Sequence, residues 1–257
     1  MDKVRPKKAL GQHFLTDESI ARRIAATLDG YEQLPTVEVG PGMGVLTKYL
    51  LESHPNLIVA EIDSESVDWL RRNYPRLEGH IVEGDFLQMD LEAVGRGGKI
   101  AVIGNYPYNI SSQIFFHVLD YKATVEVCSG MLQREVAERI CAKEGSKTRG
   151  ILSVLLQAWF DCEYLFTVNE NVFNPPPKVK SGVIRLVRNN VTDLGCDERL
   201  FRNVVKTTFG QRRKTIRNSI RPLLRPGQTI DTPLLALRPE QLSVEQFIEL
   251  TKCLQNQ

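Results

Sequence analysis

The residues Asn105, Tyr106, Pro107 and Tyr108 have the types and the order that chemistry on the exocyclic amine of adenine requires. That amine is a poor nucleophile because its lone pair is delocalised into the ring, and acceptors for its two N–H groups oppose the planar form. The side-chain carbonyl of Asn105 and the backbone carbonyl of Tyr106 are two such acceptors, and Pro107 fixes the chain direction so that both can converge. Tyr108 offers a flat face for an unstacked base. The segment therefore predicts an amine clamp beside a stacking platform.

A glycine-rich loop further upstream predicts a site for a nucleoside-containing ligand. Gly40 and Gly42, in the sequence VEVGPGMG, let the backbone pass close to a ligand just before a helix begins. A dinucleotide-binding fingerprint would place glycine at position 45, where this chain has Val45. The carboxylate of Glu38 would repel a pyrophosphate and favour a cationic ligand such as S-adenosylmethionine. The alternative is a tight strand–helix turn that binds no ligand.

Two acidic residues follow the next two apolar strand patterns. Glu61 ends the second pattern, where its carboxylate is suited to accept hydrogen bonds from both ribose hydroxyls of a nucleoside. Asp85 ends the third pattern, where it can accept from an adenine amine while Phe86 packs against the ring. Each acid alone also fits a helix cap or a turn. Because ligands of doubly wound folds bind along the carboxyl edge of the sheet, we expect these acids and Asn105 to share one site.

The elements that must position these residues alternate along the first two-thirds of the chain. Helical patterns separate strand patterns at 36–39, 57–62, 80–84, 99–104 and 124–132. This alternation predicts an α/β fold with a doubly wound, mostly parallel sheet. The composition changes near 189–197, which places the domain boundary there. We expect a catalytic domain at 1–190 and a small, helical, basic, RNA-binding domain at 191–257.

Composition and charge limit the classes of function. The chain of 257 residues has no apolar run that approaches the roughly 18 residues needed to span a bilayer, and its basic N-terminus lacks an apolar signal core. Five cysteines without a CxxC pair and four isolated histidines predict a reduced, cytoplasmic protein without a metal site. The net charge is only +2, but 199–225 holds nine Lys or Arg and no acid. This basic run indicates a polyanion partner, although a solvated helix face is the alternative.

Together the motifs resemble those of the ribosomal RNA adenine dimethyltransferases, the KsgA/RsmA family of class I methyltransferases. The matching segments include KKALGQHFL, EVGPGMG, NYPY, FNPPPKVKSGVIRL and FGQRRKTIRNSI. The resemblance implies a seven-stranded Rossmann-like sheet and S-adenosyl-L-methionine as the methyl donor. It also implies N6,N6-dimethylation of two adjacent adenosines in a hairpin loop near the 3′ end of 16S ribosomal RNA, with a role in small-subunit biogenesis. We expect a monomer.

The same resemblance assigns roles to individual residues. The residues implied to bind the methyl donor are His13, Leu15, Gly40, Gly42, Glu61, Asp85 and Asn105. The residues implied to hold the target adenine are Asn105, Tyr106, Pro107, Tyr108 and Phe173, the last as a second wall opposite Tyr108. For Phe173 the alternative is ordinary core packing. The residues implied to hold RNA phosphates are Arg212, Arg213, Lys214 and Arg217. Two positions depart from the family, because His13 replaces a frequent asparagine and Tyr106 replaces the usual leucine.

Several other functions remain open. A large-subunit ribosomal RNA methyltransferase of the macrolide-resistance type shares the catalytic motifs, although PPPKVKSG and RRKTIRN favour the small subunit. A mainly non-catalytic RNA-binding assembly factor or transcription factor would use the same fold. Val45 and the lack of a proton-relay group disfavour a nucleotide-dependent oxidoreductase. A DNA adenine methyltransferase would be expected to carry a separate target-recognition domain, which the sequence does not indicate.

Overall fold

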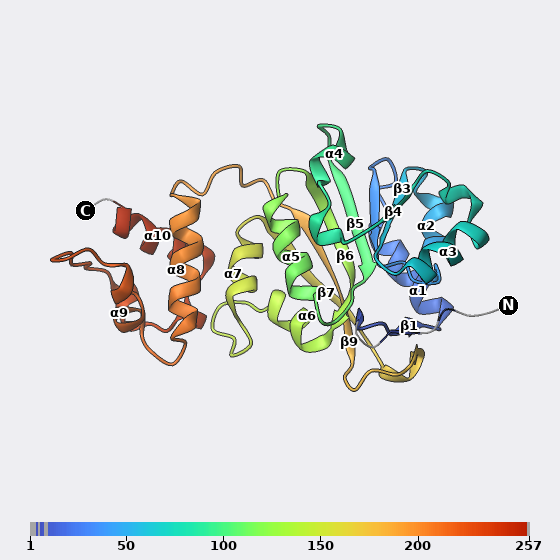
Figure 1. Ribbon diagram of the computed structural model, residues 1–257. Helices are drawn as coiled ribbons and strands as arrows, with labels where there is room; N and C mark the ends of the chain where they lie inside the picture. The colour runs from blue at the N-terminus through green and yellow to red at the C-terminus, as the bar shows by residue number, and fades with distance from the viewer. Residues whose placement is uncertain (1–3, 5, 8–9, 256–257) are drawn as a thin grey trace. The chain divides into compact units, whose positions relative to one another are not determined.

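The computed structural model describes residues 4, 6–7 and 10–255 (Figure 1). Two residues of the N-terminal motif, Lys8 and Ala9, lie outside the described residues, as do 1–3 and Arg5 of the basic N-terminus. The described chain forms two compact units. One comprises residues of Met1–Ala137 and Cys162–Arg188, and the other comprises residues of Glu138–Asp161 and Asn189–Gln257.

A seven-stranded sheet organises the first unit, with the strand order β4-β3-β2-β5-β6-β9-β7. The strands are β2 (Thr36–Val39), β3 (Leu57–Glu61), β4 (Ile81–Glu83), β5 (Ile100–Asn105), β6 (Val125–Gln133), β7 (Phe160–Val168) and β9 (Ser181–Arg188). The strands from β4 to β6 pair in parallel, whereas β9 runs antiparallel to β6. The predicted α/β fold with a mostly parallel, seven-stranded sheet is confirmed. Chain order switches between β2 and β5, which is where such sheets bind their ligands.

Helices flank this sheet (Figure 1). They are α1 (Glu18–Ala25), α2 (Thr47–Ser53), α3 (Ser64–Asn73), α4 (Leu91–Gly95), α5 (Ser111–Asp120) and α6 (Arg134–Ile140). The start of α1 is fixed by Asp17, whose carboxylate accepts the backbone N–H of Ser19 at 2.9 Å. Ile24 of α1 packs in one buried cluster with Ile103 of β5. All residues of β5 except Asn105 are buried, as expected for a central parallel strand covered on both faces.

A separate two-stranded pairing joins distant parts of the first unit. β1 (Phe14–Leu15) pairs antiparallel with β8 (Phe173–Asn174). The backbone N–H of Thr16 extends the pairing by donating to the carbonyl of Val172 at 2.8 Å. The N-terminal motif and the FNPPPK segment therefore lie side by side, at the carboxyl edge of the large sheet.

The second unit is helical. Its α-helices are α7 (Ile151–Gln157), α8 (Glu198–Gly210), α9 (Ile216–Ser219) and α10 (Val244–Gln255). Asp197 caps α8 by accepting the N–H of Leu200 at 2.6 Å, and the rings of Phe209 and Phe247 stack with centroids 5.9 Å apart. The buried guanidinium of Arg149 donates to the carbonyl of Ala142 at 2.7 Å, which holds the loop before α7. The predicted helical character of the basic C-terminal segment is confirmed.

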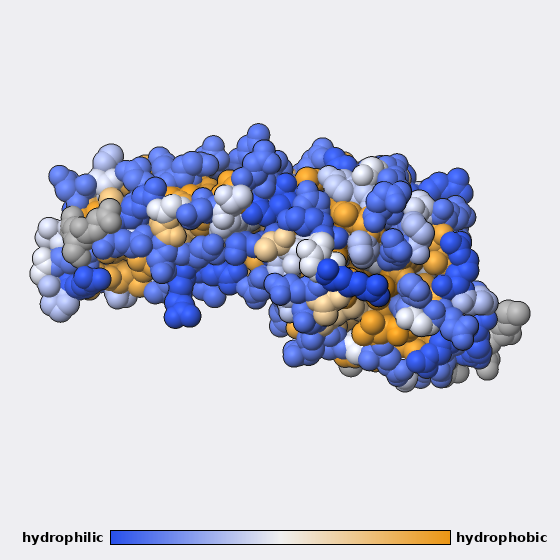
Figure 2. All heavy atoms as spheres, turned by 90° about the horizontal axis from the view of Figure 1, so that it is seen from above, coloured by the Kyte–Doolittle hydropathy of each residue, from blue (hydrophilic) through white to orange (hydrophobic). Residues whose placement is uncertain are grey.

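The surface of the described chain is mainly hydrophilic on the face that Figure 2 shows, with hydrophobic atoms in limited patches between the polar ones. None of the helices formed by the described residues has the length and apolar character needed to cross a bilayer. Within the same residues, no group of three or more His, Cys, Asp and Glu side chains is arranged to hold a metal ion.

Candidate active site

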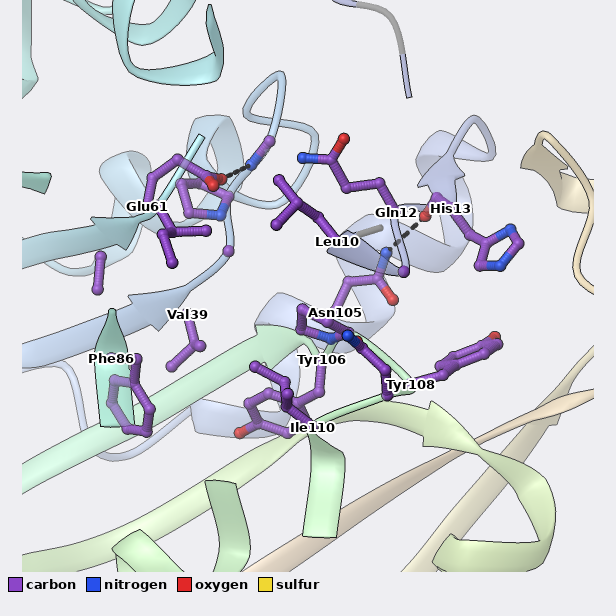
Figure 3. Close-up of a pocket in the computed structure, with 18 of the residues that line it drawn as sticks. Leu10, Gln12, His13, Val39, Glu61, Phe86, Asn105, Tyr106, Tyr108 and Ile110 are labelled. Carbon is purple, nitrogen blue, oxygen red and sulfur yellow. Dashed lines mark hydrogen bonds between the residues drawn. The ribbon is translucent and has the colours of Figure 1, made fainter. Parts of the chain in front are cut away.

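One cavity lies at the carboxyl edge of the sheet, and most of the predicted site residues line it (Figure 3). Its walls come from the N-terminal arm (residues 10–15), the loops after β2, β3 and β4, and the segment after β5. Among the lining residues are His13, Leu15, Gly40, Gly42, Glu61, Asp85, Asn105, Tyr106, Pro107 and Tyr108. Because the parallel strands end at one edge, groups that are far apart in sequence share this space.

Glu61 forms the polar end of the cavity. One carboxylate oxygen accepts the backbone N–H of Gly42 at 3.0 Å and the other accepts that of Asp63 at 2.9 Å. Burial raises the pKa of Glu61, and these N–H groups oppose the rise. Gly42 has φ +56°, and a Cβ there would come within 2.8 Å of the Phe14 ring, so only glycine fits. The carboxylate is thereby fixed with lone pairs left for the two hydroxyls of a ribose.

Another part of the cavity suits a flat heterocycle. The Asp85 carboxylate accepts the N–H of Leu87 at 2.9 Å, so it uses one of its oxygens and keeps the other for a ligand. Phe86 is 4% exposed and lines the cavity together with Val39, which lies beside it in Figure 3, and with Ile110. Apolar side chains around one carboxylate fit an adenine ring with its amine. The donor set of this cavity therefore fits the adenosine part of S-adenosyl-L-methionine.

Glu38 does not act as the sequence predicts. Its side chain is fully buried and is absent from the cavity lining. One oxygen accepts the hydroxyl of Thr47 at 2.7 Å, and the other has no partner among the residues that the structure describes. Burial raises the pKa of Glu38 to about 8, the Thr47 bond lowers it, and Glu61 adds to the rise. The Glu38 carboxyl group therefore does not face a ligand in the cavity; it links β2 to α2, and its burial favours the protonated form.

Asn105 is oriented by the N-terminal arm. Its side-chain N–H donates to the backbone carbonyl of His13 at 3.1 Å (Figure 3). Because the amide nitrogen faces this carbonyl, the amide oxygen faces away from it. That oxygen is the first predicted acceptor for the adenine amine.

Tyr106 is anchored to β6 at two points. Its backbone N–H donates to the carbonyl of Met131 at 2.9 Å, and its hydroxyl donates to the carbonyl of Ser129 at 2.6 Å. The ring is 1% exposed and occupies space left by Gly104 and Gly130, which face each other on β5 and β6. A Cβ on Gly130 would come within 2.6 Å of the ring. The Tyr106 side chain thus extends into the core and fixes the backbone that carries the second predicted acceptor.

Tyr108 is held by two distant segments. Its hydroxyl forms a short hydrogen bond with the hydroxyl of Ser181, at the start of β9. The His13 ring lies 5.4 Å from the Tyr108 ring, tilted by 32°, and Nδ1–H of His13 donates to the carbonyl of Pro175 at 2.8 Å. The predicted stacking platform is therefore positioned before any base arrives.

Phe173 is not brought into the cavity. Its side chain is 4% exposed, belongs to the buried cluster of the first unit and pairs with Leu15 across β1 and β8. This geometry is the core packing that the sequence left open. Contact between Phe173 and a flipped base would require the side chain to turn outward.

The four predicted phosphate-binding residues belong to the second unit, and none of them is among the residues that line the cavity. Arg212 donates to the carbonyl of Lys147 and lies 4.0 Å from the carboxylate of Glu240, so it holds a loop of its own unit. The exposed members of the set are Arg213, Lys214 and Arg217.

The structure also adds residues that the sequence did not single out. Leu10 and Gln12 line the cavity from the N-terminal motif, and Ile110 lines it just after the NYPY segment. Ser181 lies in the KVKSG part of another motif and bonds to Tyr108. Each lies within two residues of a predicted position or inside one of the motifs quoted above. Their position in or next to these motifs is therefore the sequence signal that could have identified them.

Comparison with known proteins shows the family to which the chain belongs. The family model described as ribosomal RNA adenine dimethylase matches residues 3–256. The ribosomal RNA small subunit methyltransferase A of Parabacteroides distasonis is 63% identical, over 96% of this chain and 93% of that protein. The protein of the same name from Porphyromonas gingivalis is 57% identical, over 99% of this chain and 100% of that protein.

Two solved structures have a similar fold. A dimethyladenosine transferase from Plasmodium falciparum has a TM-score of 0.76 at 23% identity, covering 93% of this chain and 96% of that chain. The 23S rRNA methyltransferase ErmE has a TM-score of 0.68 at 26% identity, covering 93% of this chain and 99% of that chain. The first supports the fold alone, and the match to the family model and the high identity to the relatives decide the family. The chain belongs to the ribosomal RNA adenine dimethylase family, whose members are methyltransferases that use S-adenosyl-L-methionine.

Proposed function

We propose that this enzyme dimethylates N6 of two adjacent adenosines in a hairpin loop near the 3′ end of 16S ribosomal RNA. The observation that carries the proposal is the orientation of Asn105, whose amide N–H is used by the His13 carbonyl and whose oxygen is left for the amine. Relatives named as small-subunit ribosomal RNA methyltransferases, 57% and 63% identical over nearly the whole chain, support this substrate.

The methyl donor would bind along the carboxyl edge of β2, β3 and β4. We assign the ribose hydroxyls to Glu61, and we assign the adenine ring to Asp85 and Phe86. When bound, S-adenosyl-L-methionine supplies an electrophilic methyl group on a sulfonium sulfur. His13 and Leu15 would close the cavity from the N-terminal arm, and Gly40 lets the loop after β2 approach the ligand closely.

The target adenine would stack on Tyr108 and donate its amine N–H groups to two carbonyls. The side chain of Asn105 and the backbone of Tyr106 are those acceptors, and they favour the form of the amine in which its lone pair is available. No strong base is needed, because the nitrogen loses its proton readily once methylation has made it cationic. A monomethylated amine still has one N–H group to donate, so the same clamp can serve the second transfer.

Contact with the ribosomal RNA outside the active site would come from the basic segment of the predicted domain at 191–257. Arg213, Lys214 and Arg217 are exposed there, and we assign them to RNA phosphates. Arg212 would act by holding the loop at Lys147 as well as by its charge. Such contacts give affinity with little sequence information, so site choice would come from RNA shape within the small subunit. We further propose a cytoplasmic monomer with a role in small-subunit biogenesis.

The test is methyl incorporation from labelled S-adenosyl-L-methionine into small ribosomal subunits that lack adenine dimethylation. Mass spectrometry of the digested RNA should find dimethyladenosine at two adjacent loop positions. Label in large-subunit RNA instead would support the macrolide-resistance type of substrate, which the likeness to ErmE keeps as the second candidate. Bound donor without label in any RNA would support a binding role and contradict the proposal.

A further inference from the structure

Three large apolar side chains are exposed among the described residues, and two of them have an evident place. Ile62, 55% exposed, lines the cofactor cavity, and Val82, 40% exposed, belongs to β4 at the edge of the sheet. Val179, 46% exposed, belongs to neither the cavity nor the sheet. Val179 is therefore the exposed apolar side chain that still needs an explanation.

Val179 lies close to the stacking platform. It precedes Ser181, whose hydroxyl bonds to Tyr108, by two residues. Two residues of extended chain span about 7 Å at most. The Cα atom of Val179 therefore lies within about 7 Å of that of Ser181, the residue that holds the Tyr108 platform.

The loop at 175–180 holds this valine in a fixed place. The carbonyl of Pro175 accepts from the His13 ring at 2.8 Å, and the carbonyl of Lys180 accepts the backbone N–H of Arg134 at 3.0 Å. Three consecutive prolines restrict the backbone between these points, and Pro177 is buried. The loop thus exposes an apolar side chain from a restrained backbone, so local flexibility does not account for the exposure.

The charged neighbours of Val179 indicate the kind of partner that this loop can bind. Lys178 and Lys180 flank it and are both exposed. Neither ammonium group has a hydrogen bond or an ion pair with another residue that the structure describes. Cations on both sides of an apolar side chain match RNA, in which phosphates alternate with base faces. The adjacent platform for a base favours RNA over an acidic protein.

We propose that Val179 packs into the gap that the flipped adenosine leaves in the RNA, while Lys178 and Lys180 hold the phosphates on either side. Taking a base out of its stack exposes the faces of its neighbours to water, and apolar side chains that enter such steps cover them. The inference rests on the proposed function, because the gap exists only when an adenosine enters the active site.

The experiment compares Val179→Ser with Val82→Ser, a matched change at an exposed valine on the edge strand. Methylation of undimethylated small subunits gives kcat/KM, and calorimetry gives the affinity for S-adenosyl-L-methionine. Val179→Ser should lower kcat/KM about tenfold, the effect of losing the burial of one valine side chain. Val82→Ser should leave it unchanged, and neither variant should change the affinity for the methyl donor. Val179→Ile should retain activity because it keeps the apolar surface.

The role of the two lysines is tested by measuring how the affinity for the RNA depends on salt concentration. Replacing Lys178 and Lys180 together by glutamine should reduce the slope of log affinity against log salt by about 2. Equal kcat/KM for Val179→Ser and Val82→Ser, or an unchanged salt slope, would overturn the inference. A wild-type enzyme that does not methylate small subunits would instead contradict the proposed function. The valine comparison would then be made on the RNA that the wild type does methylate.

Discussion

Replacing Glu38 by glutamine tests whether the buried carboxyl group keeps its proton in the folded enzyme. The group lies behind the glycine loop, with one oxygen on the Thr47 hydroxyl and the other without a partner among the described residues. Glutamine keeps the shape of the side chain and an acceptor for Thr47, but it cannot ionise. Any difference between the two proteins that depends on pH therefore reports the ionisation of this one carboxyl group.

The expected magnitude follows from the two pKa values of Glu38, 4.5 in its ordinary state and about 8 in the folded protein. Between these values the folded protein holds a proton that the unfolded chain releases. The stability from this proton is fully present below pH 4.5 and is lost as the pH rises through 8. At about 1.36 kcal/mol for each pKa unit, the complete loss is about 5 kcal/mol.

Urea unfolding at pH 5 and pH 9 measures the loss. The wild-type free energy of unfolding should fall by about 4 kcal/mol more between these pH values than that of Glu38→Gln, because part of the complete loss already lies below pH 5. Burial also raises the pKa of Glu61, so a smaller fall should remain in both proteins. The affinity for S-adenosyl-L-methionine at pH 7 should change little, because Glu38 does not line the cavity. The same pH dependence in both proteins would refute the reasoning.

Three further predictions concern the catalytic residues and the RNA. Asn105→Ala should abolish labelled methyl transfer while the melting temperature stays near that of the wild type; normal turnover would rule out the clamp. Tyr106→Phe removes a buried hydroxyl bond at 2.6 Å and should cost about 1–3 kcal/mol in urea unfolding. It should also lower kcat more than donor affinity, and unchanged kcat would mean that the hydroxyl does not hold the carbonyl. Replacing Arg213 and Lys214 by alanine should flatten the salt dependence of RNA binding by about 2 in slope, and identical slopes would remove both from the interface.

Much of the cavity could be predicted because it depends on local patterns and on one rule of topology. The apolar strand patterns predicted the parallel sheet, and the rule that ligands bind at the carboxyl edge predicted that Glu61, Asp85 and Asn105 would converge. The structure brings all three to one cavity. Other residues that line the cavity, such as Ile110, also lie close in sequence to the quoted motifs.

The remaining features depend on contacts between distant segments, which no local pattern carries. Tyr108 and Ser181 are 73 positions apart, and His13 and Pro175 are 162 positions apart. The burial of Phe173 follows from the pairing of two-residue strands, which are too short to be recognised by periodicity. The protonation of Glu38 likewise depends on complete burial, which its place before the glycine loop does not indicate.

The division of the chain into two units has a consequence for hybrid enzymes. The second unit takes its residues from Glu138–Asp161 as well as from Asn189–Gln257, so the chain passes between the units three times. Within that unit α7 packs against α8 and α10, and its buried face includes Leu152 and Leu155. A chimaera that exchanges only the C-terminal segment with a relative would therefore join α7 of one protein to α8 of another. Exchanging both segments together would keep their shared core intact.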